Sequence, residues 1–257
     1  MKVKAFDRGF GMTWLAAVFV FLYLPIAALV VYSFNDSPVP NLWRGFTLKW
    51  YAKLLGDREM RAGLWLSLQI AFFTACGSVV LGTLAAFTLA KYKRFFGRTL
   101  FSGMVNAPLV MPEVVVGLSL LLFLVSVQRA LGFPERGMLT IWLGHLLLGM
   151  AYATVVIQSR LAEMNPQLEE AAMDLGARPW QVMKDVTLPV CFPAIMSGWL
   201  LAFTISLDDV VITSFTTGPG TTTLPLLIWS KVKLGVTPDI NALTTIILIL
   251  VGTGDNI

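Results

Sequence analysis

Three acidic residues interrupt segments of the chain that are otherwise apolar. Asp208 and Asp209 are adjacent in one such segment, and Glu113 follows Pro112 in another. A carboxylate at the centre of a bilayer costs on the order of 2.5–3.5 kcal/mol, so chains keep such groups where they line a cavity or have a partner. The three carboxylates could therefore guide a cation across a membrane. The alternatives are an interfacial helix cap for the adjacent pair and, for Glu113, the outer end of a shorter helix.

Two further residues are candidates for the same path. Trp43 could stack against the methylene chain of a cation, although a tryptophan in such a segment more often anchors the chain at a membrane interface. Ser206 lies shortly before Asp208 in the same apolar segment. The sole histidine, His145, is expected to be a hydrogen-bonded packing residue. The sequence contains no nucleophile–base constellation, no phosphate-binding glycine loop and no metal-ligand cluster, so it does not indicate enzymatic chemistry.

The composition is that of a membrane protein. Of the 257 residues, 56% are hydrophobic and 13% are charged, whereas soluble domains carry about 25% charged residues. A transmembrane helix needs about 20 consecutive apolar residues, and several uncharged runs reach that length. The net charge of +4 does not indicate nucleic-acid binding, because the basic residues lie in short loops between apolar runs, where they set topology.

These runs predict an all-α membrane protein with a single transmembrane domain over residues 1–257. The expected spans are about 14–34, 62–90, 104–127, 138–157, 190–215 and 240–257. Pro108 and Pro112 should kink or unwind the third span. We expect the fifth to continue as a helix through the acidic pair, about 27–29 Å from Val190, between the outer third of the bilayer and its outer interface. The apolar run Ala242–Val251 has only ten residues, so we expect the sixth span either to include the weakly polar tail after it or to be incomplete or altered.

The distribution of basic residues orients the chain. The tail before the first span holds three Lys or Arg residues, and the segment 91–98 holds four. The segment 35–61 holds five, but they are spread over 27 residues. Since dense basic loops stay in the cytoplasm, we expect the N-terminus and the loop 158–189 to be cytoplasmic. The first span is expected to remain uncleaved, because no small-residue cleavage site follows it.

The loop between the fourth and fifth spans is predicted to form two short helices. Asn165 can cap the first, and Pro166 suits its first position. Gly176 can adopt positive φ and end that helix. Pro179 would start the second helix, and Leu188-Pro189 would stop it before the membrane. A compact helix at the tip of a loop can dock into a cleft of a partner protein, and the alternative is an ordinary capped helical hairpin.

The same loop resembles the coupling loop of ABC-importer permeases. It carries Glu170-Ala171-Ala172, then Gly176, and Leu188-Pro189 near its end. Every fixed position of that family's motif is matched except an isoleucine, which Val186 replaces. The resemblance implies that these residues couple the chain to an ATPase on another polypeptide, which would hold the ATP and magnesium. This chain would then be a transport subunit and not an enzyme, with no cofactor of its own.

Further segments make the chain similar to the permeases of bacterial polyamine (putrescine/spermidine) ABC importers. They are Ala107–Glu113, Arg136–Leu143, and Leu207–Ile212 with Gly218-Pro219-Gly220 after it. The likeness covers about Trp14 to Asn241, and it implies a six-helix type I ABC importer permease with a methionine-importer-permease-like core, in the bacterial inner membrane. The partners that it implies are a second homologous permease, two ATPase subunits and a periplasmic polyamine-binding protein. The family continues into a full sixth helix and a basic tail, where this chain has Gly252–Ile257.

Acidic groups in the path suit a polyamine, because its separated ammonium groups can meet several carboxylates at different stages. The main alternative is a permease for another small solute, and acids in the spans argue against an anion. A membrane enzyme would need a polar catalytic cluster at membrane depth, which a single histidine and dispersed acids do not provide. A scaffold without transport activity would leave the coupling motif unexplained.

Overall fold

The computed structural model describes residues 3–37, 42–92, 94–235 and 237–254. This part of the chain is helical, and its one β feature is an isolated bridge between Asn35 and Phe46. It forms two compact units, Met1–Arg61 with Ile228–Ile257, and Ala62–Leu227. Five described segments are long and apolar enough to cross a membrane: Phe10–Tyr32, Arg58–Lys91, Glu113–Leu131, Met138–Glu163 and Pro179–Asp208. The predicted all-α membrane class is confirmed.

The first unit combines the N-terminal and C-terminal segments of the chain. It contains α1 (Val3–Tyr32), α2 (Lys49–Gly56), the start of α3 (Arg58–Lys91), the end of α11 (Leu224–Leu234) and α12 (Pro238–Gly254). α12 packs against α1 and α2. An ion pair of 3.4 Å between Lys231 Nζ and Asp57 Oδ2 connects α11 to the start of α3. Trp43 precedes α2, is 51% exposed, and places its ring against that of Tyr32.

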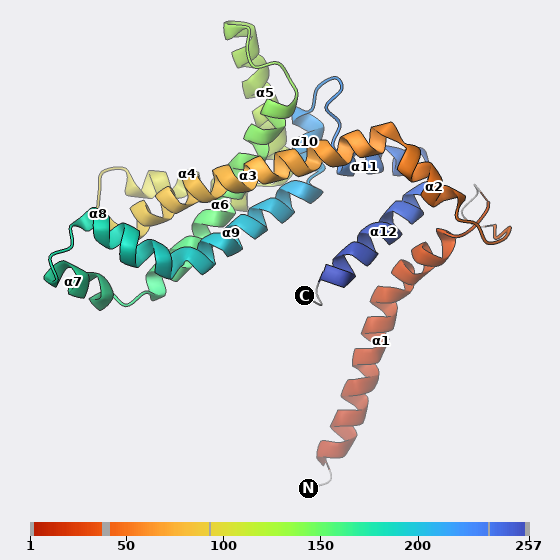
Figure 1. Cartoon of the computed structure of the whole chain (residues 1–257), viewed down its shortest axis with the longest axis horizontal. Helices are drawn as coiled ribbons and strands as arrows, with labels where there is room; N and C mark the ends of the chain where they lie inside the picture. Colours follow the sequence, from red (N-terminus) through yellow and green to blue (C-terminus); the bar gives the residue numbers. More distant parts are fainter. Residues whose placement is uncertain (1–2, 38–41, 93, 236, 255–257) are drawn as a thin grey trace. The chain divides into compact units, whose positions relative to one another are not determined.

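The second unit contains the rest of α3 and most of the helices that follow it (Figure 1). These are α4 (Arg98–Val110), α5 (Glu113–Leu131), α6 (Met138–Glu163), α7 (Gln167–Asp174), α8 (Pro179–Val182), a π-helical turn (Met183–Thr187), α9 (Leu188–Asp208) and α10 (Val211–Thr216). α6 packs against α4, α9 and α10. Its Ala153 is the nearest neighbour of Gly82 in α3 and of Gly198 in α9. Small residues thus let three helices approach closely, as is common in membrane proteins.

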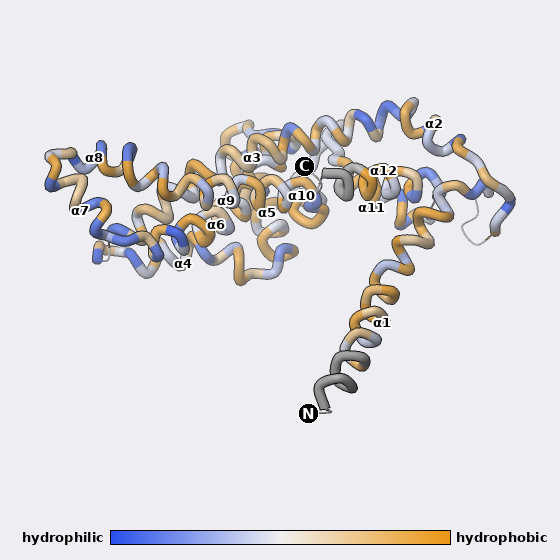
Figure 2. Tube along the Cα trace, turned by 60° about the horizontal axis from the view of Figure 1, so that its bottom comes forward, coloured by the Kyte–Doolittle hydropathy of each residue, from blue (hydrophilic) through white to orange (hydrophobic). Residues whose placement is uncertain are grey.

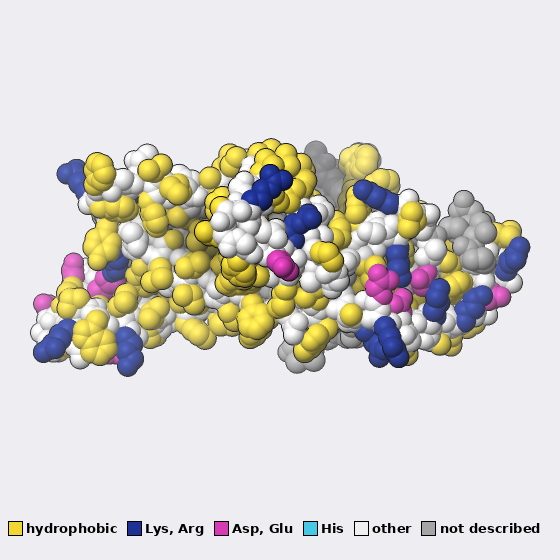
Figure 3. All heavy atoms as spheres, turned by 90° about the horizontal axis from the view of Figure 1, so that it is seen from above, with side chains coloured by type: hydrophobic (Ala, Val, Ile, Leu, Met, Phe, Trp, Pro, Cys, Tyr) yellow, Lys and Arg dark blue, Asp and Glu magenta, His cyan; other side chains and the backbone are white. Residues whose placement is uncertain are grey.

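The surface of the long helices is apolar. Hydrophobic residues dominate these helices, while hydrophilic residues gather near α7 and α8 (Figure 2). Hydrophobic side chains also cover much of the face shown in Figure 3. Only 17% of the apolar window of α5 and 22% of that within Pro179–Asp208 are buried. Exposed apolar surface of this extent must be covered by lipid or by other membrane subunits.

Two expected spans are not single helices. The third is divided at Met111 and Pro112, where α4 ends and α5 begins, while Pro108 lies within α4 without ending it. The expectation that the fifth span stays helical through both acids is wrong. α9 ends at Asp208 because the backbone of Asp209 is extended, and α10 begins as a separate helix.

The region after the fifth span contains further helices. No span was predicted between residues 215 and 240, and this region contains α11. Leu224 and Leu227 lie three residues apart on one side of this helix and are both buried, as is typical of a helix with an apolar face. α12 follows with 17 residues from Pro238 to Gly254. The final positions of the expected sixth span, 255–257, lie outside the described residues.

Candidate functional site

The carboxyl end of α9 is a helix break built around two acidic residues. α9 ends at Asp208, and Asp209 has φ −65° and ψ 129°, which is extended backbone. The Asp209 carboxylate accepts hydrogen bonds from the backbone N–H groups of Thr213 (2.8 Å) and Ile212 (3.3 Å). The first N–H groups of a helix lack intrahelical acceptors, so Asp209 satisfies two of those in α10. An acidic side chain therefore caps the helix that follows the break.

A buried polar cluster holds this break. His145 of α6 places Nδ1 2.7 Å from Ser206 Oγ and Nε2 3.1 Å from Asp209 Oδ2. Thr213 Oγ1 lies 2.9 Å from both His145 Nε2 and Asp209 Oδ2. The side chains of His145 and Asp209 are 2% and 7% exposed. The cluster is therefore almost closed to solvent, and His145 is the hydrogen-bonded packing residue that the sequence predicted.

Asp208 has a different environment from its neighbour. It is exposed and is the last residue of α9. The last four carbonyl groups of an α-helix have no intrahelical donors and carry the negative end of the helix dipole. A carboxylate beside those carbonyl groups attracts a cation. Asp209 thus has the capping role that was the alternative for the pair, whereas Asp208 offers an accessible charge.

The remaining candidates for the path are not members of the polar cluster. Glu113 is the first residue of α5, follows Pro112, and is exposed. α5 packs against α10, and a Cβ at Gly117 would lie 2.5 Å from the ring of Phe215. Glu113 is therefore one helical turn from the contact between these helices. Trp43 belongs to the other compact unit.

The loop before α9 contains two short helices, α7 and α8. Asn165 Oδ1 accepts a hydrogen bond of 3.0 Å from Gln167 N, as expected of a capping side chain. Glu170 and Ala171 are exposed, and Ala172 is half-buried. The face of α7 that carries the first two residues of the motif is therefore accessible to a partner.

Gly176 ends α7 in the expected way. Its φ is +89°, a conformation that favours glycine. The N–H of Gly176 donates to the carbonyl of Met173 (2.8 Å), and the N–H of Ala177 donates to that of Ala172 (3.0 Å). This pair of bonds is the Schellman motif, which satisfies the last carbonyl groups of a helix.

The second short helix does not stop at Leu188-Pro189, contrary to expectation. α8 continues through the π-helical turn into α9, whose first two residues are Leu188 and Pro189. A proline inside a helix clashes with the carbonyl four residues earlier. That carbonyl belongs to Asp185, within the π-helical turn, where the wider winding accommodates the ring. α8, the π-helical turn and α9 therefore form one continuous helical segment.

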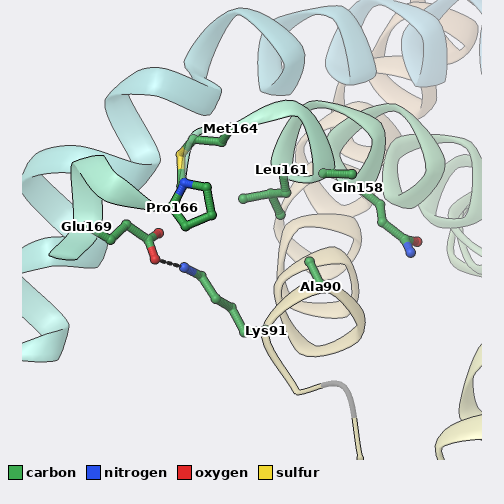
Figure 4. A pocket seen from close by; sticks show the side chains of 8 residues that line it. Ala90, Lys91, Gln158, Leu161, Met164, Pro166 and Glu169 are labelled. Carbon is green, nitrogen blue, oxygen red and sulfur yellow. Dashed lines mark hydrogen bonds and ion pairs between the residues drawn. The ribbon is translucent and has the colours of Figure 1, made fainter.

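Glu169 anchors α7 to two other helical segments. Its carboxylate pairs with Lys91 at the end of α3 and accepts a hydrogen bond of 2.6 Å from Thr187 Oγ1. Lys91 and Glu169 line a cavity of about 460 Å³ together with Pro166 and Leu161 (Figure 4). Burial raises the pKa of Glu169, but the hydrogen bonds from Lys91 and Thr187 and the Lys91 charge outweigh it and hold that pKa below its usual value.

We expect Glu169→Gln to loosen α7 without unfolding the spans, because the substitution removes the charge that Lys91 pairs. A partly exposed ion pair contributes about 0.5–1 kcal/mol, so the amides of α7 should exchange hydrogen about two to five times faster. Since the pKa of Glu169 is lowered, the anchor is fully present above the ordinary pKa of a glutamate and is lost as the pH falls through the lowered one.

Hydrogen exchange in the assembled complex measures this effect. Glu163→Gln is the control, because Glu163 is 73% exposed and lies 3.8 Å from Arg160. Unchanged protection of α7 in Glu169→Gln would contradict the anchoring role.

Comparison with known proteins defines the class. Residues 78–254 match the family described as "Binding-protein-dependent transport system inner membrane component". The chain belongs to this family of membrane transport permeases.

Individual proteins share sequence with this chain over most of its length. The putrescine transport system permease protein PotI of Escherichia coli (strain K12) is 54% identical over 235 residues, which cover 91% of this chain and 84% of that protein. The spermidine/putrescine transport system permease protein PotC of the same strain is 39% identical over 243 residues, which cover 95% of this chain and 89% of that protein. The resemblance to polyamine permeases is thereby confirmed.

Solved ABC importers share the fold. A bacterial alginate transporter in complex with an alginate pentasaccharide-bound periplasmic protein aligns with a TM-score of 0.73 and 17% identity, over 97% of this chain and 91% of that chain. The methionine transporter MetNI in an inward-facing conformation aligns with a TM-score of 0.59 and 15% identity, over 80% of this chain and 92% of that chain. These likenesses confirm the type I ABC importer permease fold.

Proposed function

We propose that this chain is the membrane permease subunit of an ATP-driven polyamine importer. The observation that carries the proposal is the 54% identity to a putrescine permease over 91% of the chain. With a second, homologous permease it would form the path for putrescine or spermidine. A periplasmic binding protein would deliver the substrate, and two ATPase subunits would drive the cycle from the cytoplasm, on the side where the N-terminus lies.

The chemistry at the end of α9 supports a cationic substrate. Asp208 combines an exposed carboxylate with the carbonyl end of a helix. Glu113 supplies a second exposed carboxylate on another helix of the same unit. A dication with two ammonium groups separated by methylenes can engage such groups in succession. Weak contacts between the carboxylates and the substrate suffice in the membrane, because tight binding there would slow release of the substrate.

The loop between α6 and α9 supports an ATPase partner. Leu168, Met173 and Leu175 around the exposed motif are 48%, 46% and 90% exposed. Apolar side chains of this kind at the tip of a loop stabilise an interface once a partner covers them. Glu170, Ala171, Ala172 and Gly176 would form the docking surface, and Leu188 and Pro189, the first residues of α9, would receive its movement.

Substrate uptake tests the proposal. The complex of this chain with its partner subunits is reconstituted in proteoliposomes, with ATP supplied on the side of the ATPases. Labelled putrescine and spermidine should accumulate, and an anionic dicarboxylate of similar length should not. Accumulation of neither polyamine under conditions in which ATP is hydrolysed would contradict the polyamine assignment.

A second expected result concerns which subunit binds and hydrolyses ATP. The purified chain alone should hydrolyse no ATP, because its sequence has no phosphate-binding loop. Hydrolysis should appear when the ATPase subunits are added, and it should rise further with the loaded binding protein. Nucleotide binding by the isolated chain, measured with a fluorescent ATP analogue, would contradict this assignment of roles.

A further inference from the structure

The cluster at the α9–α10 break contains a histidine that the proposed path does not use. Asp209 already accepts bonds from the backbone N–H groups of Ile212 and Thr213 and from the hydroxyl of Thr213. His145 Nε2 is the fourth hydrogen-bond partner of the carboxylate, 3.1 Å from Asp209 Oδ2. Three of these donors bond to Oδ2 and one to Oδ1, and the side chain is only 7% exposed. Asp209 therefore belongs to the structure of the break and not to its contact surface.

His145 bonds to both sides of the break at once. One arrangement of protons satisfies the cluster: Nε2–H donates to Asp209, and the hydroxyl of Ser206 donates to Nδ1. Ser206 lies in the last turn of α9, whereas Asp209 caps α10. The imidazole is thus a rigid bridge between the end of one helix and the start of the next.

α6 provides a fixed platform for this bridge. Thr140 Oγ1 donates to the carbonyl of Thr216 at 2.7 Å, which attaches the other end of α10 to the same helix. Between these two contacts, a Cβ at Gly144 would lie 2.6 Å from Ile212 Cγ2. α10 is therefore held against α6 at Thr213, Ile212 and Thr216.

We propose that His145 is a positioning residue for Asp208. By bridging Ser206 and Asp209, it fixes the break immediately after Asp208 and keeps the carboxylate of Asp208 exposed beside the carbonyl end of α9. The cationic ligand of Asp208 rests on the proposed function, but the bridge itself does not. Without His145, the break relaxes, and Asp208 loses its fixed orientation.

The accessibility of position 208 tests the bridge without reference to transport. Cys76→Ser and Cys191→Ala remove the two cysteines of the chain, and Asp208→Cys then introduces one thiol. A positively charged methanethiosulfonate reagent should label this thiol in the assembled complex in membranes. His145→Phe removes the hydrogen bond to the Asp209 carboxylate, so the break should no longer keep position 208 exposed. Labelling should therefore slow about tenfold, the effect of losing a hydrogen bond to a charged group. His145→Gln keeps one donor and should slow it less.

Thr154→Val is the matched control. Thr154 is a buried hydroxyl on the same helix, and it donates to the carbonyl of Met150 within α6 at 2.7 Å. Its loss should leave the labelling rate unchanged. Unchanged labelling in His145→Phe, or equal slowing in Thr154→Val, would overturn the proposal. If His145→Phe does not assemble, Ser206→Ala removes one end of the bridge and should also slow labelling, and a normal rate would overturn the proposal in the same way.

Uptake kinetics then connect the bridge to the substrate. With Asp208 intact, His145→Phe should raise the KM for putrescine about tenfold, with a smaller change in kcat and normal assembly. A proportional loss of kcat at unchanged KM would contradict a positioning role. If the wild-type complex transports no polyamine while labelling still depends on His145, the proposed function fails and the bridge stands.

Discussion

Gly176→Asp is expected to abolish most ATP-driven uptake while the chain still inserts into the membrane. The Schellman turn at Gly176 requires a φ of +89°, and a side chain in this region costs roughly 1–2 kcal/mol. A Cβ there would meet no atom within 4 Å in the chain itself, so the carboxylate would project from the tip of the loop. Placing an unpaired charge in a docking interface costs about 2–5 kcal/mol, which corresponds to a loss of about 30-fold or more.

Gly97→Asp separates docking from backbone strain. Gly97 has φ +81°, and a Cβ there also has open space, but it precedes α4 and lies outside the coupling motif. Uptake and co-purification of the ATPase are measured for both variants. We expect both to fall in Gly176→Asp and to be largely retained in Gly97→Asp. Equal losses of uptake and of ATPase co-purification in both variants would assign the effect to backbone strain. Wild-type uptake and co-purification in Gly176→Asp would refute the docking role of the loop.

Asp208→Asn is expected to lower polyamine uptake about 5- to 150-fold, since a hydrogen bond to a charged group contributes about 1–3 kcal/mol. The substitution keeps the shape of the side chain and removes its charge. Assembly and basal ATP hydrolysis should remain, because Asp208 is exposed and the coupling loop is unchanged. Glu113→Gln should lower uptake through the same loss of charge. Asp209→Asn should act differently, because it disturbs the cap of α10 and the bond to His145.

Uptake per assembled complex is the measurement for the three variants. Asn106, which is half-buried and bonds within α4 to Ser102, offers a control through Asn106→Ala. Near-normal uptake in all three acid variants would exclude an acidic path while leaving the permease assignment intact. Loss of assembly in Asp208→Asn would instead indicate that the residue is structural.

Local sequence rules predicted the features that depend on neighbouring residues. The positive φ of Gly176 and the start of α8 at Pro179 follow from the conformational limits of these two residue types. The all-α membrane class follows from uncharged runs long enough to span a bilayer. The division between α4 and α5 also follows a local rule, because Pro112 cannot continue the helix before it.

Features that depend on distant residues were not predictable in this way. The end of α9 is fixed by a contact between Asp209 and His145, which are 64 positions apart in sequence. No local pattern reveals that contact, so the sequence predicts a helix that continues through the acidic pair. The π-helical turn before Pro189 is likewise a geometric solution that residue type alone does not specify. The spacing of Ser206, Asp209 and Thr213 was the available signal, because it places three polar side chains toward one side of an apolar segment.

The continuous passage from α8 through the π-helical turn into α9 has a mechanical consequence. α9 has 21 residues, so it is a rod of about 30 Å with the docking loop at one end and Asp208 at the other. A movement of α8 imposed by an ATPase would be passed to α9 as a whole, because α8 continues through the π-helical turn into α9 without a break. The carboxylate of Asp208 would then be raised, lowered or turned in step with the closing and opening of the nucleotide sites. Capture and release of a cation at Asp208 would then be coupled to the binding and hydrolysis of ATP.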